Sequence, residues 1–240
     1  MLVQLKLQTA PGRIATSNSS ISTTNPDRDG EDATSRMRAD AAPLVRQQRR
    51  GRRRGTFLSG ARLASVTNPV YTVGHSIRTI DEFAELLIAA EICTLVDVRS
   101  SPSSRRFPNF NREPLSDALE SLQIGYVYCA ALGGHRGKSK MIAQEINAFW
   151  ENQSFHNYAD YAMSEAFLAG LERIIETSQH ELTAIMCAEA VWWRCHRRII
   201  ADYLISRQIP VRHILGPGKI VEAQMTLSAE RRGAVISYPA

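Results

Sequence analysis

The 240-residue sequence has little of what marks a secreted or membrane protein. Its cysteines are too few and too unevenly spaced for a disulfide framework. No apolar run approaches the roughly 18 residues that span a bilayer, and the N-terminus lacks the basic and apolar stretches of a signal peptide. We therefore expect reduced thiols, no membrane association and a cytoplasmic location. The four cysteines are Cys93, Cys129, Cys187 and Cys195.

The excess of positive charge is confined to the N-terminal segment. Residues 1–67 carry 12 Lys and Arg against 5 Asp and Glu, whereas the remainder carries 17 against 19. The remainder therefore gives no charge-based reason to expect nucleic-acid binding. The basic run Arg46–Arg54 could tether a nucleic acid. The simpler interpretation is a solvated tail, because charge runs alone are weak indicators of function.

The hydrophobic pattern divides the chain near residue 68. Residues 1–67 are rich in polar residues and show no sustained period, which predicts a disordered N-terminal tail. Residues 68–240 alternate short apolar runs with helical periods, which predicts one Rossmann-like, three-layer α/β domain with a mostly parallel sheet of about five strands. The expected strands are 70–73, 93–98, 125–129, 181–186 and 211–215. The expected helices are 79–90, 115–122, 141–150, 155–177 and 195–207, with a short helix near 219–229 and an edge strand at 234–238.

Polar clusters follow the first four expected strands. His75 follows the first and Arg99 the second, while the glycine-rich loop Gly133–Lys138 follows the third. Cys187 and Glu189 follow the fourth. Because the carboxyl ends of parallel strands share one edge of a sheet, we expect these clusters to share one crevice.

Seven short motifs occur in a characteristic order: Thr72–Ser76, Leu95–Arg99, Pro102–Arg106, Phe107–Phe110, Leu132–Gly134, Cys187–Glu189 and Cys195–Arg197. Over about residues 70–215 this set resembles the bacterial family called domain of unknown function 488. The resemblance implies a compact Rossmann-like α/β domain and supplies no reaction. The sequence departs from the family pattern at Ala190–Arg194, where a polar, proline-containing loop is usual. Trp192 and Trp193 in this loop could stack on a base or ring, or pack against the sheet or a partner.

The basic side chains near the expected crevice favour a small anionic ligand. Arginine offers a bidentate fork to phosphate or carboxylate, and a helix start offers free backbone N–H groups. The alternative is that the arginines form ion pairs with Asp97 and Glu189. The candidate ligand-binding residues are Arg99, Arg197, Arg105, Arg106, Lys138, His196 and Cys195.

Three side chains are candidates for catalysis. Glu189 and His75 form the expected acid–base pair, although His75 could instead bond its neighbouring turn. Cys187 is a candidate nucleophile because nearby Arg and His groups could lower its pKa. Its surroundings resemble rhodaneses and cysteine phosphatases, but the loop to Arg194 is one residue longer than phosphatases use. The alternative for Cys187 is a buried core thiol. Asp97 is expected to orient backbone N–H groups or Arg99.

A metal site is a further alternative, formed by Cys187, Cys195, His196 and His75. Seven residues separate the two cysteines, which is no familiar zinc spacing, so the sequence does not favour it. The leading hypothesis is a domain that binds or processes a small anionic, phosphate- or nucleotide-like ligand. The alternatives are a non-catalytic nucleic-acid or ligand-binding module, and a metal-dependent hydrolase or zinc-binding domain. Enzyme activity, the cofactor and the oligomeric state stay open.

Overall fold

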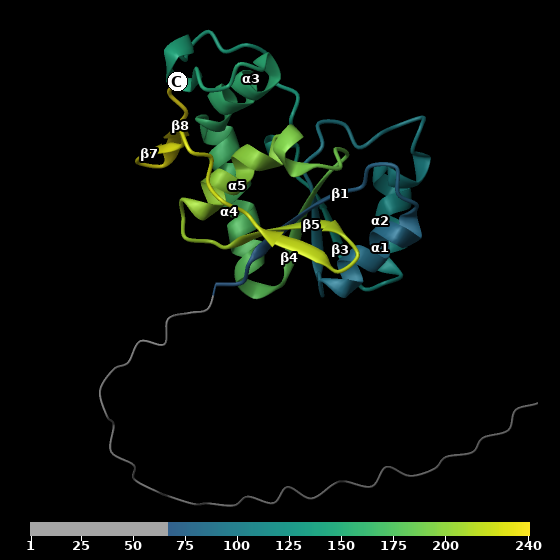
Figure 1. Ribbon diagram of the computed structural model, residues 1–240. Coiled ribbons are helices and arrows are strands. Elements are labelled where there is room, and N and C mark those ends of the chain that lie inside the picture. Colours follow the sequence, from purple (N-terminus) through teal and green to yellow (C-terminus); the bar gives the residue numbers. More distant parts are fainter. Residues whose placement is uncertain (1–66) are drawn as a thin grey trace, which may run out of the picture. The chain divides into compact units, whose positions relative to one another are not determined.

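The computed structural model describes residues 67–240 (Figure 1). The predicted disordered tail lies outside this range except for Thr67, and the basic run Arg46–Arg54 lies wholly outside it. Within the described range, none of the helices is long and apolar enough to cross a membrane.

A six-stranded sheet runs through the centre of the described residues, in the order β3-β2-β4-β1-β5-β6. Strands β1 to β5 are mutually parallel and β6 pairs antiparallel with β5, so the predicted mostly parallel sheet is confirmed. The strands are β1 (Val70–Gly74), β2 (Thr94–Asp97), β3 (Gly125–Tyr128), β4 (Thr183–Cys187), β5 (Val211–Gly216) and β6 (Lys219–Glu222).

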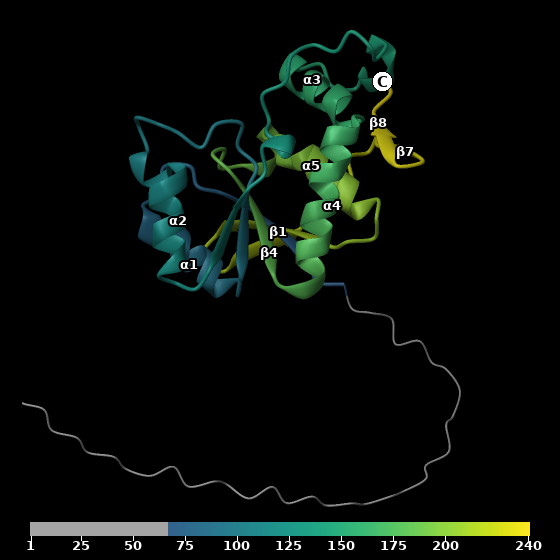
Figure 2. The same ribbon diagram turned by 180° about the vertical axis from the view of Figure 1, so that it is seen from behind.

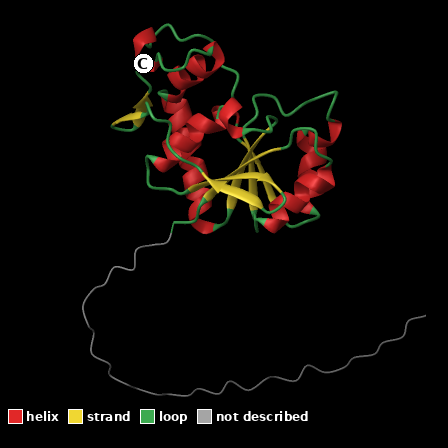
Figure 3. Cartoon of the chain, in the orientation of Figure 1, coloured by secondary structure: helices red, strands yellow, loops and turns green. Residues whose placement is uncertain are grey.

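Helices cover both faces of the sheet and give the predicted three layers (Figures 2 and 3). Helices α1 (Ile80–Ala89) and α2 (Arg112–Glu120) cover one face. The opposite face carries α3 (Gln153–Ala162), α4 (Glu165–His180) and α5 (Arg197–Ile205).

Each buried strand supplies side chains to two separate cores. Neighbouring residues on a strand point to opposite faces. Val70 and Val96 accordingly belong to the core under α3, α4 and α5, whereas Val73 and Leu95 belong to the core under α1 and α2. Burial on both faces explains why the central strands are continuously apolar.

Several boundaries differ from the sequence prediction. The expected helix 155–177 is two helices, because the chain breaks at Met163 and Ser164 caps α4 by accepting a hydrogen bond from the N–H of Phe167. The expected helix 141–150 contains only a short 3-10 turn, in which buried Asn147 donates to the Asp160 carboxylate.

The C-terminal segment also needs correction. Instead of a helix near 219–229 the chain forms β6, because Gly218, with a φ of 63°, turns it back onto β5. The expected edge strand at 234–238 exists as β8 (Val235–Ser237). It pairs with β7 (Glu230–Arg232) as a separate two-stranded sheet.

Neighbouring strands β1 and β4 mark the point where the winding of the sheet reverses. The connection that leaves β1 passes through α1 on one face, while the connection that leaves β4 passes through α5 on the other. In open parallel sheets, ligands bind at such a switch point, outside the carboxyl ends of the strands.

Candidate functional site

A cavity of about 670 Å³ lies at the carboxyl edge of the sheet. The structure brings five sequence-predicted residues into its lining: Arg99, Cys187, Glu189, Cys195 and His196. They come from the ends of β2 and β4 and from the start of α5, as the strand-end argument predicts. The cavity also takes in side chains that sequence reasoning missed, among them Arg136, Tyr158 and Arg194. The sequence could have indicated Arg136, because it belongs to the glycine-rich loop after β3 that was expected at the crevice. Nothing in the sequence pattern indicated Tyr158, which belongs to α3.

The other predicted residues lie outside the cavity lining. His75 and Arg197 are at the same edge of the sheet but are buried, with 2% and 1% of their surface exposed. Arg105, Arg106 and Lys138 are exposed on loops and are not among the lining residues.

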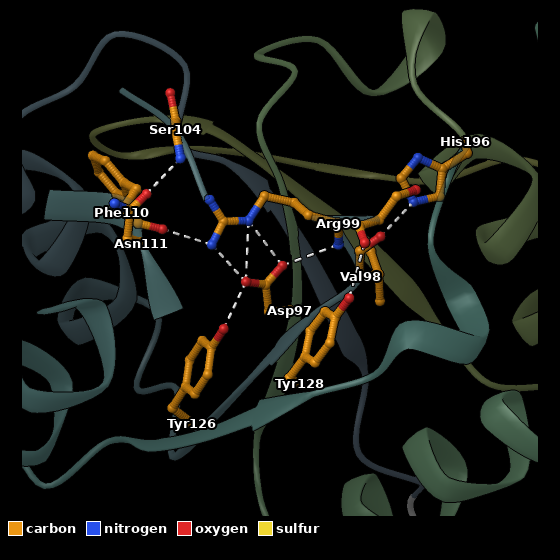
Figure 4. Close-up of polar contacts among 10 residues, drawn as sticks. Asp97, Val98, Arg99, Ser104, Phe110, Asn111, Tyr126, Tyr128 and His196 are labelled. Carbon is orange, nitrogen blue, oxygen red and sulfur yellow. Dashed lines mark hydrogen bonds and ion pairs between the residues drawn. The ribbon is translucent and has the colours of Figure 1, made fainter. Parts of the chain in front are cut away.

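Asp97 and Arg99 form a buried ion pair at the end of β2 (Figure 4). Arg99 Nη2 lies 2.6 Å from Asp97 Oδ2, and Arg99 Nε and its backbone N–H also donate to the carboxylate. Tyr126 donates its hydroxyl to the same carboxylate at 2.7 Å. Burial alone would lower the pKa of Arg99, but the hydrogen bonds and charge of Asp97 outweigh it and raise that pKa. The expectation that Asp97 orients Arg99 matches this geometry.

His196 is held against the end of β2 from the opposite side. Its Nε2 lies 3.0 Å from the carbonyl oxygen of Val98 (Figure 4). Because a carbonyl only accepts hydrogen bonds, Nε2 carries the proton in the neutral ring, and Nδ1 keeps its lone pair. A Cβ atom on Gly134 would lie 2.4 Å from Nδ1, so this close approach requires glycine after β3.

Two thiols face the free nitrogen of His196. Its Nδ1 lies 3.5 Å from Cys195 Sγ and 3.9 Å from Cys187 Sγ. Burial alone would raise the pKa of Cys195, but the hydrogen bond from Cys187 and the neighbouring His196 and Arg197 hold it well below its usual value. The same hydrogen bond, together with burial, raises the pKa of Cys187. The raised pKa of Cys187 does not support this thiol as the activated nucleophile.

Arg197 lies beneath the thiols. Its Nε donates to Cys195 Sγ at 3.3 Å, and its Nη2 donates to the carbonyl oxygen of Glu189. No carboxylate among residues 67–240 forms an ion pair with this guanidinium. Its N–H groups are therefore bonded to sulfur and to a backbone carbonyl, and no carboxylate among these residues balances its charge.

His75 packs against the α1 and α2 side of the sheet edge. Its ring stacks on Phe110 with centroids 4.2 Å apart, and its Nδ1 bonds the carbonyl of Ser76. Burial and the nearby Arg99 lower the pKa of His75 to about 4. The ring is therefore neutral at pH 7 and lies outside the cavity that contains Glu189. The bond between His75 Nδ1 and the carbonyl of Ser76 is the one that the sequence offered as the alternative to an acid–base role.

The tryptophan pair has two different environments. Trp192 stacks on His213 with centroids 4.3 Å apart, so it packs against the sheet edge. Trp193 is 48% exposed and meets Trp192 edge to face. Neither is among the residues that line the cavity.

The environment of His213 predicts a pH-dependent stability. This ring is 1% exposed, bonds Thr72 through Nδ1, and has a pKa lowered to about 4 by burial and by Arg197. Between pH 6.5 and pH 4 the unfolded chain binds a proton at this position that the folded chain does not. The contribution of His213 to the free energy of unfolding is therefore fully present above pH 6.5. It is lost as the pH drops towards 4, at up to about 1.4 kcal/mol per pH unit.

Urea unfolding between pH 6.5 and 4.5 checks this prediction. We expect His213→Gln to reduce the slope of unfolding free energy against pH by about 1 kcal/mol per pH unit. His180→Gln, at an exposed position, is the control and should keep the wild-type slope. An unchanged slope in the His213 variant would mean that the folded state accommodates the protonated ring.

The described residues thus form a three-layer α/β domain with a cavity at the carboxyl ends of β2 and β4. A family model described as Domain of unknown function DUF488 matches residues 79–204. The chain belongs to this family. The matched range contains every residue that lines the cavity and ends short of the β5–β6 hairpin. No curated protein and no solved structure matches the chain.

Proposed function

We propose that this domain binds a small anionic ligand, such as a phosphate or a phosphate ester, in the cavity at the carboxyl edge of the sheet. The observation that carries the proposal is the charge of the lining. Three arginines, Arg99, Arg136 and Arg194, line the cavity, while Glu189 is the one carboxylate among the described lining residues. Asp97 behind the lining compensates Arg99, so Arg136 and Arg194 carry the excess of positive charge. A cavity with low-dielectric walls and one predominant sign of charge concentrates ligands of the opposite sign.

The three arginines differ in how free their N–H groups are. Arg99 uses Nε and Nη2 for Asp97 and Phe110, and among the described residues its Nη1 makes no hydrogen bond. Arg136 bonds backbone carbonyls through Nε and Nη2 and lies 3.6 Å from the Tyr161 ring centroid. Arg194 is exposed at the mouth of the cavity. Arg99 and Arg136 are therefore preorganised donors, and Arg194 is the donor that can adapt to a ligand.

Arg197 contributes to this proposal through its charge. It is buried beneath Cys195, so its field reaches the cavity although its N–H groups are already bonded. Glu189 is exposed at the wall and opposes an anion by like-charge repulsion. It is also the group in the cavity best suited to accept a proton from a bound ligand.

Calorimetric titration of the chelator-treated protein with inorganic phosphate, pyrophosphate and adenosine monophosphate tests the proposal. We expect Arg194→Ala to weaken the binding of whichever of these three anions binds most tightly by about tenfold. A loss of that size corresponds to one charge-assisted hydrogen bond. Glu189→Gln should leave the affinity unchanged or raise it, because it removes a like charge.

Arg232→Ala is the matched control. Arg232 is an exposed arginine on β7 that pairs with Glu230, and such a pair contributes little to stability. Binding in this variant should equal that of the wild type. Absence of binding by all three probes, or equal losses in Arg194→Ala and Arg232→Ala, would contradict the proposal.

A further inference from the structure

The inner wall of the cavity holds two sulfur atoms and one nitrogen in a tight group. Cys187 Sγ, Cys195 Sγ and His196 Nδ1 all lie within 4.8 Å of one another. Zinc bonds of about 2.3 Å to sulfur and 2.0–2.1 Å to nitrogen, at tetrahedral angles, place neighbouring ligand atoms about 3.6–3.8 Å apart. The two sulfur-to-nitrogen distances, 3.5 and 3.9 Å, bracket that range.

We propose that Cys187, Cys195 and His196 bind one zinc-type divalent metal ion and leave its fourth coordination position open to the cavity. Two thiolates and an imidazole are soft and borderline ligands, which suit zinc and do not suit magnesium or calcium. Among the described residues, no further Cys, His, Asp or Glu side chain joins the group. All three ligand residues line the cavity, so solvent or a bound molecule would complete the tetrahedron.

The orientation of His196 is already that of a metal ligand. Its Nε2 donates to the carbonyl of Val98, which directs the unprotonated Nδ1 towards the two sulfurs. Metal-bound histidines in proteins commonly bond a backbone carbonyl through the second ring nitrogen in this way. The carbonyl is itself fixed, because the next residue, Arg99, is held by Asp97 through its backbone N–H and its side chain.

The scaffold of the three ligands is rigid. Cys187 ends the central strand β4, and Cys195 and His196 lead directly into α5. Arg197, at the first position of α5, donates to Cys195 Sγ at 3.3 Å. A donor to a ligating thiolate partly offsets its negative charge. The two thiolates balance the charge of a divalent ion, so the positive charge that remains beside the site is that of Arg197, which is compatible with an anionic ligand but does not require one.

Cobalt titration of the full chain tests the site, because Co²⁺ reports its own coordination geometry. We expect reduced, chelator-treated protein to bind one equivalent of Co²⁺ with the strong d–d absorption of a tetrahedral ion and a sulfur-to-cobalt charge-transfer band. One equivalent of Zn²⁺ should abolish both signals by displacement.

Cys187→Ser and His196→Gln are the test variants, and each should reduce bound metal well below one equivalent. Any Co²⁺ that Cys187→Ser still binds should show a weaker charge-transfer band, because one thiolate is lost. Cys93→Ser and His180→Gln remove an exposed thiol and an exposed imidazole elsewhere and should match the wild type. Thermal unfolding of the metal-free proteins identifies any variant that fails to fold. Cys187 is only half-buried, so its serine variant is the one expected to keep the wild-type fold.

Three outcomes would overturn the proposal. In the first, the reduced wild type binds neither Co²⁺ nor Zn²⁺. In the second, bound Co²⁺ gives an octahedral spectrum without a charge-transfer band. In the third, Cys187→Ser and Cys93→Ser bind equal amounts of metal. A Cys187–Cys195 disulfide that forms readily in a protein that never binds metal would assign the thiol pair to redox chemistry instead. The anion titrations use metal-free protein, so the metal site and the anion site succeed or fail separately.

Discussion

Asp97→Ala is expected to lower the free energy of unfolding by about 3–5 kcal/mol, the usual cost of leaving one partner of a buried ion pair unmatched. Asp97 is fully buried, and its partner Arg99 is 7% exposed at the side chain. The substitution leaves the guanidinium without a counter-charge and leaves the Tyr126 hydroxyl without its acceptor. Urea unfolding at fixed pH measures the loss.

Two further variants separate charge from packing at this position. A double variant, Asp97→Leu with Arg99→Met, replaces the pair with apolar groups and should recover much of the stability, because no uncompensated charge remains. Glu230→Ala breaks the exposed pair with Arg232 and should cost less than about 1 kcal/mol. If Asp97→Ala lowers the free energy of unfolding by less than about 1 kcal/mol, another group or solvent must stabilise the charge of Arg99 in the variant.

The same ion pair also supports the cavity wall. Arg99 Nη2 reaches across to the carbonyl of Phe110, and the neighbouring Val98 carbonyl holds His196. Loss of Asp97 should therefore free both the loop before α2 and the imidazole at the start of α5. The Asp-x-Arg motif at the end of β2 and the Cys-His-Arg motif at the start of α5 are therefore structurally linked.

Local signals predicted most of the fold. The expected helix 79–90 begins at Thr79, whose side chain and that of Glu82 form a capping box with both hydrogen bonds present. Long-range pairing was harder to predict. The β5–β6 hairpin depends on contacts across the sheet edge, and the period of 155–177 continues through a break because α3 and α4 bury residues in the same core. Gly218 and the Ser164 cap are the local features at these two places, and the hydrophobic period alone does not reveal them.

The strand-end rule gathered Arg99, Cys187 and Glu189 at one cavity, but it could not supply side-chain directions. His75 turns away because Phe110, far along the chain, provides a stacking surface for it. Loop spacing argued against a metal because familiar zinc spacings describe ligands on one short loop. Here Cys187 ends a strand and Cys195 precedes a helix. The packing of that strand and helix sets the distance between the two sulfur atoms, so the number of residues in the loop does not decide it.

Gly74→Ala is expected to destabilise the protein by about 3 kcal/mol through a clash with backbone. Gly74 ends β1, where the Glu189 segment crosses it. A Cβ atom on Gly74 would lie 2.0 Å from the carbonyl oxygen of Glu189 and 3.0 Å from the Cα of Ala190. No rotamer change relieves contacts with backbone atoms, so the segment after β4 has to move.

That movement would break a second interaction, which is why the expected loss is large. The displaced carbonyl of Glu189 is the acceptor for the buried guanidinium of Arg197. Gly216→Ala is the matched control, because Gly216 ends the neighbouring strand β5 and a Cβ atom there meets nothing within 4 Å. Urea unfolding should place this control within about 0.5 kcal/mol of the wild type. Equal stabilities of the two alanine variants would contradict this prediction. They would show that the backbone around Glu189 can move to accommodate a Cβ atom at little cost in free energy.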